Sequence, residues 1–188
     1  GLLPWTMFAS SLGEACTAFV AAEAAMKSRQ YPYSIQIHAV VARNVVIFGH
    51  NLLTYALVAA ICGVTITPAT VLVIPGLFLL ILNLGWICLL VAILCLRFRD
   101  FQQMVTIFLQ VAMFVTPLFW PVSQLTGRRA IIADLNVLYH LIELVRAPLL
   151  GKAPALQGYL ICIAMAAVGW LAAYWLLARK RHRLVFWF

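Results

Sequence analysis

The stretch RFRDFQQMVTIFLQVAMFVTPLFWP, residues 97–121, decides the fold. The charged group Arg97-Phe98-Arg99-Asp100 ends one long apolar run, and a second apolar run begins directly after it. A helix needs about 20 apolar residues to cross the ~30 Å hydrocarbon core of a bilayer. Two such runs joined by so few residues predict a tight helical hairpin, with the charged group at one face of the membrane.

The composition of the whole chain agrees with this prediction. Of 188 residues, 65% are hydrophobic and 10% are charged, whereas roughly a quarter of the residues in soluble domains are charged. We therefore expect an all-α integral membrane protein, a helical bundle with one transmembrane domain over residues 1–188. The net charge of +8 does not indicate a nucleic-acid partner, because the basic residues stand at the ends of apolar runs, where they anchor membrane helices.

The apolar runs predict five spans. They cover about 1–22, 37–64, 71–96, 101–120 and 158–178. Between the first two spans, Glu23 and Lys27 are four residues apart, as in a helix-stabilising pair. Pro32 disfavours helix at the residue before it, so residues 23–36 are expected to form a short amphipathic helix and a turn at the surface.

Residues 121–157 are too polar to span the membrane. An apolar stripe at helical spacing runs through Leu135, Leu138, Ile142, Val145 and Leu149. Asp134 is the expected N-cap of this helix, and Glu143 and Arg146 are three residues apart, so that they can form an ion pair. The segment is interpreted as an extracytoplasmic helix that lies in the membrane interface or dips back into the membrane as a re-entrant hairpin.

The expected spans contain ionisable residues, among them Glu14, Arg43 and His50. Glu14 is unfavourable at bilayer depth unless it faces protein or water, and its role is either functional or structural. Arg43 is long enough to extend its charge to the near membrane face. His50 is interpreted as a hydrogen-bonded interior residue and not as a proton relay. No neighbouring residues complete a metal site around it.

Basic residues orient the chain. If successive loops alternate between the two faces, the 23–36 loop, the 97–100 turn and the C-terminal tail share one side. That side holds Lys27, Arg29, Arg97, Arg99, Arg179, Lys180, Arg181 and Arg183, and the other holds Arg128, Arg129, Arg146 and Lys152. Eight basic residues against four predict that the first side, with the C-terminus, is cytoplasmic.

No motif of a catalytic site is present in the sequence. It has no phosphate-binding loop, no H-E-x-x-H, no G-x-S-x-G, and only five carboxylate side chains. A membrane-embedded enzyme normally gathers acidic groups or histidines at one depth. We therefore expect a chain that moves, binds or scaffolds a molecule, with no metal and no cofactor of its own.

Several segments, in order, resemble the permease subunits of type-2 ABC exporters. Residues 1–14, GLLPWTMFASSLGE, resemble the second span of that family, and KSRQYP at 27–32 resembles its cytoplasmic coupling segment. Phe98-Arg99-Asp100, followed by TPLFWP at 116–121, resembles the family pattern F-R-D…S-P-I-x-Y, with Thr116 in place of the usual Ser.

The second half of the chain extends the resemblance. Asn136…Glu143…Arg146 is similar to the family pattern N-P…E…R, with Val137 in place of Pro, and the final RHRLVFWF resembles the end of the polysaccharide-exporting branch. The family's N-terminal amphipathic helix and first span would precede residue 1. The resemblance therefore implies the last five spans of a six-span permease.

The resemblance implies a half-transporter in the inner (cytoplasmic) membrane. Two copies would line a path for a lipid-linked or growing polysaccharide, such as O-antigen, capsule or teichoic acid. Two separate ATPase subunits would bind ATP and Mg²⁺ and drive export. The alternatives are an ABC exporter of a drug or a lipid, a membrane-embedded envelope glycosyl- or acyltransferase, and a structural scaffold.

Individual residues have expected roles in such a transporter. Coupling to the ATPase subunits is implied for Glu23, Lys27, Ser28, Arg29, Gln30, Tyr31, Pro32, Arg97, Arg99 and Asp100. The candidates for the translocation path are Trp5, Phe8, Glu14, Phe119, Trp120 and Tyr139. The aromatic rings in this second group either stack on sugar rings or form an interfacial belt.

Overall fold

The computed structural model describes residues 1–23, 33–63, 67–117 and 136–184. Within those ranges the chain is helical and contains no strand. The elements are α1 (Leu2–Ala21), α3 (Tyr33–Ile61), the 3-10 helix η1 (Pro68–Leu72), α4 (Val73–Arg97), α5 (Phe101–Val115), α7 (Val137–Leu149) and α8 (Leu156–Leu184). The prediction of an all-α helical bundle is confirmed.

Three helical stretches of the described chain are long and apolar enough to cross a membrane: Ser34–Ile61, Pro68–Arg97 and Leu156–Arg179. α5 is apolar but has only 15 residues. α1 has 20 residues, about 30 Å of helix at ~1.5 Å per residue, but hydroxyl residues and Glu14 interrupt its apolar run. Three described helices thus meet the criterion for a span, and the five spans expected from the sequence stay a prediction.

Some helix ends differ from the expected spans. α5 ends at Val115, because Pro117 disfavours helix at the residue before it and Thr116 is extended (φ −79°, ψ 131°). α3 begins four residues before the expected position 37, and α8 continues to Leu184. Basic residues of good helix propensity continue α8 beyond its apolar run.

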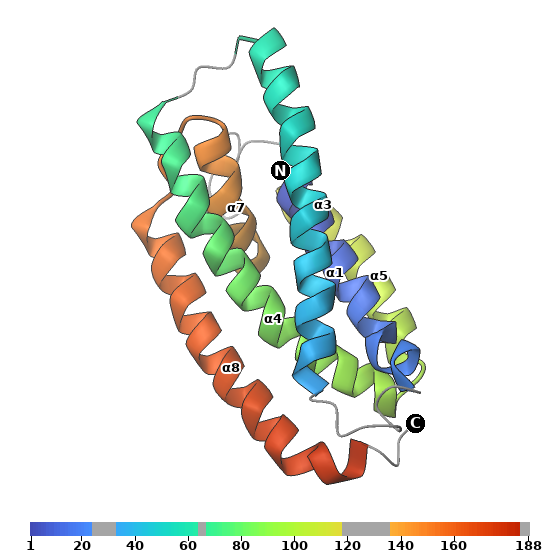
Figure 1. Cartoon of the computed structure of the whole chain (residues 1–188). Helices are drawn as coiled ribbons and strands as arrows, with labels where there is room; N and C mark the ends of the chain where they lie inside the picture. Colours follow the sequence, from blue (N-terminus) through green and yellow to red (C-terminus); the bar gives the residue numbers. More distant parts are fainter. Residues whose placement is uncertain (24–32, 64–66, 118–135, 185–188) are drawn as a thin grey trace.

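α4 lies at the centre of the bundle (Figure 1). It contacts α1, α3, η1, α5, α7 and α8, which are all the other elements of the described chain. Its sequence, VIPGLFLLILNLGWICLLVAILCLR, is apolar around the whole circumference of the helix. Such a helix is expected to be covered on every side.

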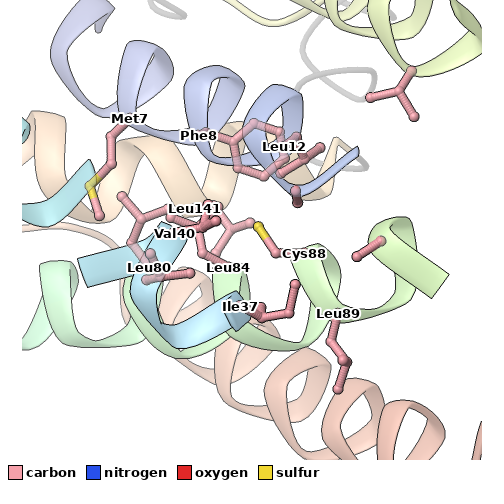
Figure 2. Close-up of a cluster of buried hydrophobic side chains, with 14 of the residues drawn as sticks. Met7, Phe8, Leu12, Ile37, Val40, Leu80, Leu84, Cys88, Leu89 and Leu141 are labelled. Carbon is pink, nitrogen blue, oxygen red and sulfur yellow. The ribbon is translucent and has the colours of Figure 1, made fainter. Parts of the chain in front are cut away.

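The core forms where α1, α3, α4 and α7 meet (Figure 2). Leu80 and Leu84 of α4 are fully buried in it. They lie among Met7, Phe8 and Leu12 from α1, Ile37 and Val40 from α3, and Leu141 from α7. The core therefore joins both halves of the sequence.

The two ends of the bundle are distinct (Figure 1). α4 ends at Arg97 and α5 begins at Phe101, which is the tight hairpin expected from the sequence. The last residues of α1, the first residues of α3 and the end of α8 lie near this hairpin. We call this the turn end. The opposite end, where α7 lies, is the α7 end.

Two glycines bring α4 and α8 into close contact. A Cβ atom on Gly85 of α4 would lie 2.7 Å from Cζ2 of Trp170 on α8, and a Cβ atom on Gly169 of α8 would meet the ring of Trp86 on α4. The Trp170 indole N–H donates to the Leu82 carbonyl oxygen at 3.0 Å. A tryptophan ring of each helix thus packs directly against a glycine of the other helix, where any larger residue would collide with the ring.

α7 docks against the first turns of α4 through a third close approach. A Cβ atom on Gly76 would collide with the Leu144 carbonyl oxygen, so glycine lets the two backbones touch. The N-cap of α7 is Asn136, whose side chain accepts from the amides of Leu138 (3.0 Å) and Tyr139 (3.3 Å). The expectation that Asp134 caps this helix is wrong, because the helix begins at Val137, directly after Asn136.

We predict that Gly85→Ala and Gly169→Ala each lower the free energy of unfolding by about 1–3 kcal/mol, the usual effect of overpacking a filled core. Gly13→Ala is the matched control, because a Cβ atom there meets nothing within 4 Å. Denaturant titration in detergent micelles, followed by tryptophan fluorescence, measures all three. Equal stability of the Gly85, Gly169 and Gly13 variants would contradict the packing described here.

Candidate functional site

The exposed side of α1 carries small polar residues. Thr6, Ser10, Gly13 and Thr17 are all exposed. Their spacing of four, three and four residues places them on one helix face. We call this stripe the α1 polar face. It occupies the part of α1 that remains after α3, α4 and α5 have covered the rest of the helix.

α5 continues this polar surface on one side. Gln102, Thr106 and Gln110 are exposed and follow one another at intervals of four residues. Near the turn end, Thr17 of α1 and Gln102 of α5 line one hollow of about 370 Å³. The amide and hydroxyl stripe of α5 therefore borders the α1 polar face at this hollow.

α3 borders the α1 polar face on the other side. A second hollow, of about 300 Å³, is lined by Thr17 and Glu14 of α1 and by Gln36 and Arg43 of α3. Thr17 lines both hollows. The polar surface thus extends from α5 across α1 to α3.

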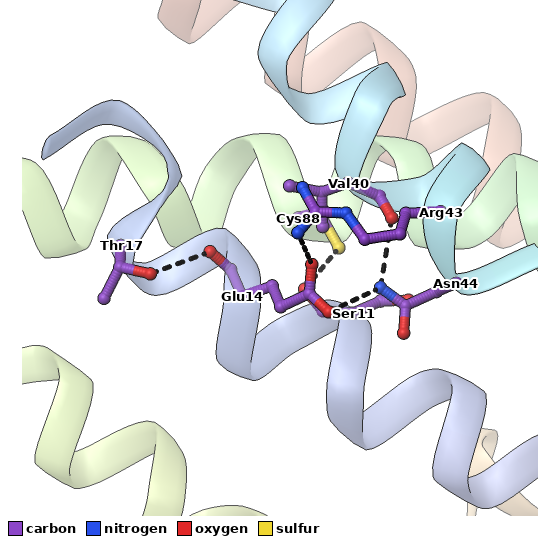
Figure 3. A network of polar contacts seen from close by, with 7 residues as sticks. All are labelled: Ser11, Glu14, Thr17, Val40, Arg43, Asn44 and Cys88. Atoms are coloured by element: carbon purple, nitrogen blue, oxygen red, sulfur yellow. Dashed lines mark hydrogen bonds and ion pairs between the residues drawn. The ribbon is translucent and has the colours of Figure 1, made fainter. Parts of the chain in front are cut away.

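Glu14 connects α1 to α3 inside this surface (Figure 3). Its Oε2 lies 3.3 Å from Nη1 of Arg43, and its Oε1 accepts from Nδ2 of Asn44 at 3.2 Å. Asn44 is buried and also donates to the Val40 carbonyl oxygen at 3.0 Å. Glu14 is therefore paired across the helix interface.

α8 presents a very different exposed side. Its exposed large residues are Leu156, Leu160, Ile163, Val168, Leu171, Tyr174 and Trp175. An apolar exterior of this kind suits lipid, whereas exposed hydroxyl, amide and charged groups at membrane depth are expected to face water, a ligand or protein. The bundle therefore has an apolar side on α8 and a polar side on α1.

The structure brings two of the predicted coupling residues together at the turn end. Glu23 and Arg99 line the same hollow as Thr17 and Gln102. Arg97 stacks its guanidinium on the Phe98 ring, 5.2 Å from the centroid. Arg97, Arg99 and Asp100 are exposed in the short connection between α4 and α5.

Polar bonds tie the two residues that follow α5 to α7. Arg146 Nη1 donates to the Pro117 carbonyl oxygen at 2.8 Å and lies 3.9 Å from Glu143 Oε2. Asn136 Nδ2 donates to Thr116 Oγ1 at 3.2 Å. These bonds hold the extended residues after α5 against the start and the last turn of α7.

Two predicted path residues are not open to a path in this structure. The side chains of Trp5 and Phe8 are 4% and 3% exposed, and their ring centroids are 5.9 Å apart on the buried side of α1. Large aromatic rings gain most from burial, which places them opposite the α1 polar face. Tyr139 is half-buried, with its ring 5.5 Å from that of His140.

Other expectations have different outcomes. His50 lies on the exposed side of α3, so its interpretation as an interior residue is wrong. The predicted residues outside the described ranges are Lys27, Ser28, Arg29, Gln30, Tyr31, Pro32, Phe119 and Trp120. Among the residues that the structure describes, no group of three or more His, Cys, Asp and Glu residues lies together as metal ligands.

The family comparison agrees with this architecture. The family model described as "ABC-2 type transporter" matches residues 1–150. The chain belongs to the ABC-2 type transporter family. It is therefore a multi-pass membrane protein and the membrane component of a transporter. No curated protein matches the chain.

Several important residues of this ABC-2 transporter chain were not singled out from the sequence. Ser10, Gly13, Thr17 and Gln110 belong to the polar surface, and Asn44 holds Glu14. A helical-wheel count of hydroxyl and amide residues over 1–22 and 101–120 would have revealed the two stripes. The Glu14–Arg43 contact spans 29 positions and has no local signature.

We predict that Arg146→Gln weakens the attachment of residues 116–117 to α7, because the charge-assisted hydrogen bond to the Pro117 carbonyl oxygen is lost. Such bonds contribute about 1.5–3 kcal/mol. Glu143→Gln is the control, since it removes the longer ion pair but leaves that bond. Hydrogen exchange of the Thr116 amide, which donates to the Ala112 carbonyl oxygen at 2.8 Å, should be faster in Arg146→Gln than in Glu143→Gln. The same exchange rate in both variants would show that Arg146 does not hold this attachment.

Proposed function

We propose that this chain is the permease subunit of an ATP-driven exporter that moves a lipid-linked or growing polysaccharide across the cytoplasmic membrane. Membership of the ABC-2 type transporter family supports transport. The polar surface of α1 and its neighbours supports the choice of substrate.

The chemistry of the α1 polar face carries this proposal. Its exposed groups are hydroxyls and a glycine, and the neighbouring α5 stripe adds amides. Such groups donate and accept hydrogen bonds without carrying a charge, which matches the many hydroxyl groups of a glycan. A path for hydrophobic drugs or lipids is expected to be lined mainly by apolar and aromatic side chains. In this protomer the exposed apolar and aromatic residues lie mainly on α8, α3 and α5, outside the α1 polar face.

The complete exporter is proposed to contain two copies of this chain and two ABC ATPase subunits. A single copy leaves the α1 polar face exposed, and a second copy would enclose it together with the first. The ATPase subunits, which would themselves bind ATP and Mg²⁺, would dock at the turn end, where Glu23 and Arg99 share a hollow. This orientation makes the turn end and the C-terminus cytoplasmic, in agreement with the excess of basic residues there.

Export of a hydrophobic drug or lipid is the second candidate function. The exposed apolar residues Met104, Ile107, Phe108, Val111 and Phe114 on α5 favour it. ATP hydrolysis by the purified complex distinguishes the two candidates. An undecaprenyl-linked glycan should stimulate hydrolysis if the first is correct, whereas stimulation by hydrophobic drugs alone would reject it. A glycan-transfer assay on the isolated chain tests the transferase alternative.

We predict that Gly13→Leu blocks polysaccharide export, with a reduction of at least about tenfold, because a branched side chain would project from the α1 polar face into the path. Gly49→Leu is the matched control: its Cβ position on α3 is also open, and the added apolar volume is identical. Export measured in cells that carry the complete transporter compares the two. Equal export by the Gly13 and Gly49 variants would show that the α1 polar face does not line the path.

We also predict that replacing Lys27, Arg29 and Tyr31 together by Ala uncouples ATP hydrolysis from export. These residues belong to the proposed coupling segment, so their loss should leave hydrolysis and dimer formation intact while export falls. Both activities are measured on the same purified complex in proteoliposomes. Unchanged export in the triple variant would reject this coupling segment.

A further inference from the structure

Arg43 is an exposed charged residue that lies far from the turn end along α3. It follows the first residue of α3, Tyr33, by ten positions, which is about 15 Å along the helix from the turn end. Its side chain is 62% exposed, although it contacts Glu14, whose side chain is 33% exposed. An exposed guanidinium at this depth is unfavourable in lipid, so it is expected to face water or an anionic group.

Most of the hydrogen-bonding capacity of Arg43 is unused. A guanidinium has five N–H donors, and within the described part of the chain that of Arg43 makes one polar contact, from Nη1 to Glu14 Oε2 at 3.3 Å. Arg43 lines the hollow of about 300 Å³, which Thr17 and Gln36 also line. The hollow therefore combines a free side of a guanidinium with a hydroxyl and an amide.

Glu14 has a second partner that keeps it in place. Asn44 donates to Oε1 at 3.2 Å and is itself fixed by its bond to the Val40 carbonyl oxygen at 3.0 Å. If the guanidinium turns toward a ligand in the hollow, the carboxylate keeps this hydrogen bond. Glu14 is thus suited to be the counter-ion of Arg43 when no ligand is bound (Figure 3).

We propose that Arg43 binds the phosphate group of a membrane lipid in the hollow between α1 and α3, with Glu14 as its counter-ion in the unloaded state. The planar guanidinium matches phosphate oxygens with two parallel hydrogen bonds. The amide of Gln36 supplies a further donor, and the Thr17 hydroxyl, which donates to the Glu14 carbonyl oxygen at 3.2 Å, lines the hollow as an acceptor. Because Thr17 also belongs to the α1 polar face, a head group attached to this phosphate would lie next to that face.

Two lipids carry this chemistry: a polyprenyl diphosphate carrier and an anionic phospholipid such as phosphatidylglycerol. The first source rests on the proposed function, since it is the carrier of the exported glycan. The second does not depend on that function. The phosphate site itself requires only the geometry around Arg43.

The test measures binding of fluorescent farnesyl diphosphate to the permease–ATPase complex in an uncharged maltoside detergent. Arg43→Gln should weaken binding about tenfold or more, the effect of losing a charge-assisted contact. Glu14→Gln should leave binding unchanged or tighten it, because a competing carboxylate is gone. Arg43→Lys, which keeps the charge, should retain part of the affinity. Arg179→Gln, the same charge change on α8, is the control and should bind as the parent does.

The opposite effects of the Glu14 and Arg43 variants distinguish a binding site from a structural ion pair. A purely structural pair predicts that both variants weaken binding together and lower the unfolding temperature equally. It also predicts that the exchanged pair, Glu14→Arg with Arg43→Glu, restores binding. Either result would overturn the proposal, as would unchanged binding in Arg43→Gln.

Competition identifies the source of the phosphate. Displacement of the probe by undecaprenyl phosphate at lower concentration than phosphatidylglycerol supports the carrier lipid, and equal displacement supports a phospholipid head group. Displacement by farnesol, which has no phosphate, would overturn the site.

If the parent complex binds the probe but exports no glycan, the proposed function fails and the phosphate site stands. If it exports glycan and Arg43→Gln binds normally, the site fails and the function stands.

Discussion

Every other described element packs against α4, and the structure depends on this constraint. In lipid, the hydrophobic effect does not drive helices together, so close backbone approach and interhelical hydrogen bonds take its place. α4 provides both. Gly76 and Gly85 admit the backbone of α7 and the ring of Trp170. The buried Asn83 donates to the Cys162 carbonyl oxygen at 3.1 Å and accepts from the Trp86 indole at 3.0 Å.

The polar side of the molecule follows from how α1 meets α4. α1 turns its largest apolar residues, such as Trp5, Phe8 and Phe19, into the core. Apart from Leu2 and Val20, the exposed residues of α1 are small or hydroxyl-bearing, and four of them form the α1 polar face. α5 covers one flank of α1 and α3 the other, and each adds polar groups at the border. One face of α1 thus packs in the core, and the opposite face borders the candidate path.

The sequence predicted the helices well, because apolar runs and the charged turn at Arg97–Asp100 are local signals. It predicted the pairings poorly, because these depend on contacts between distant residues. The ion pair of Glu14 with Arg43 joins two helices, and nothing near either residue indicates it. Asp134 and Asn136 are both good capping residues, and only the start of α7 at Val137 decides between them. Trp5 and Phe8 were assigned to the path because they are aromatic and lie toward the predicted extracytoplasmic end, although burial is the more favourable use of an aromatic ring.

α5 is fixed in different ways at its two ends. At the turn end it is continuous with α4 through three residues, beside the hollow that Glu23 and Arg99 share. At the α7 end, Thr116 and Pro117 are held by Asn136 and Arg146. Between these ends most of α5 is exposed and only Val105 and Ala112 are buried. α5 therefore connects the 97–100 turn to α7 along the outside of the core around α4.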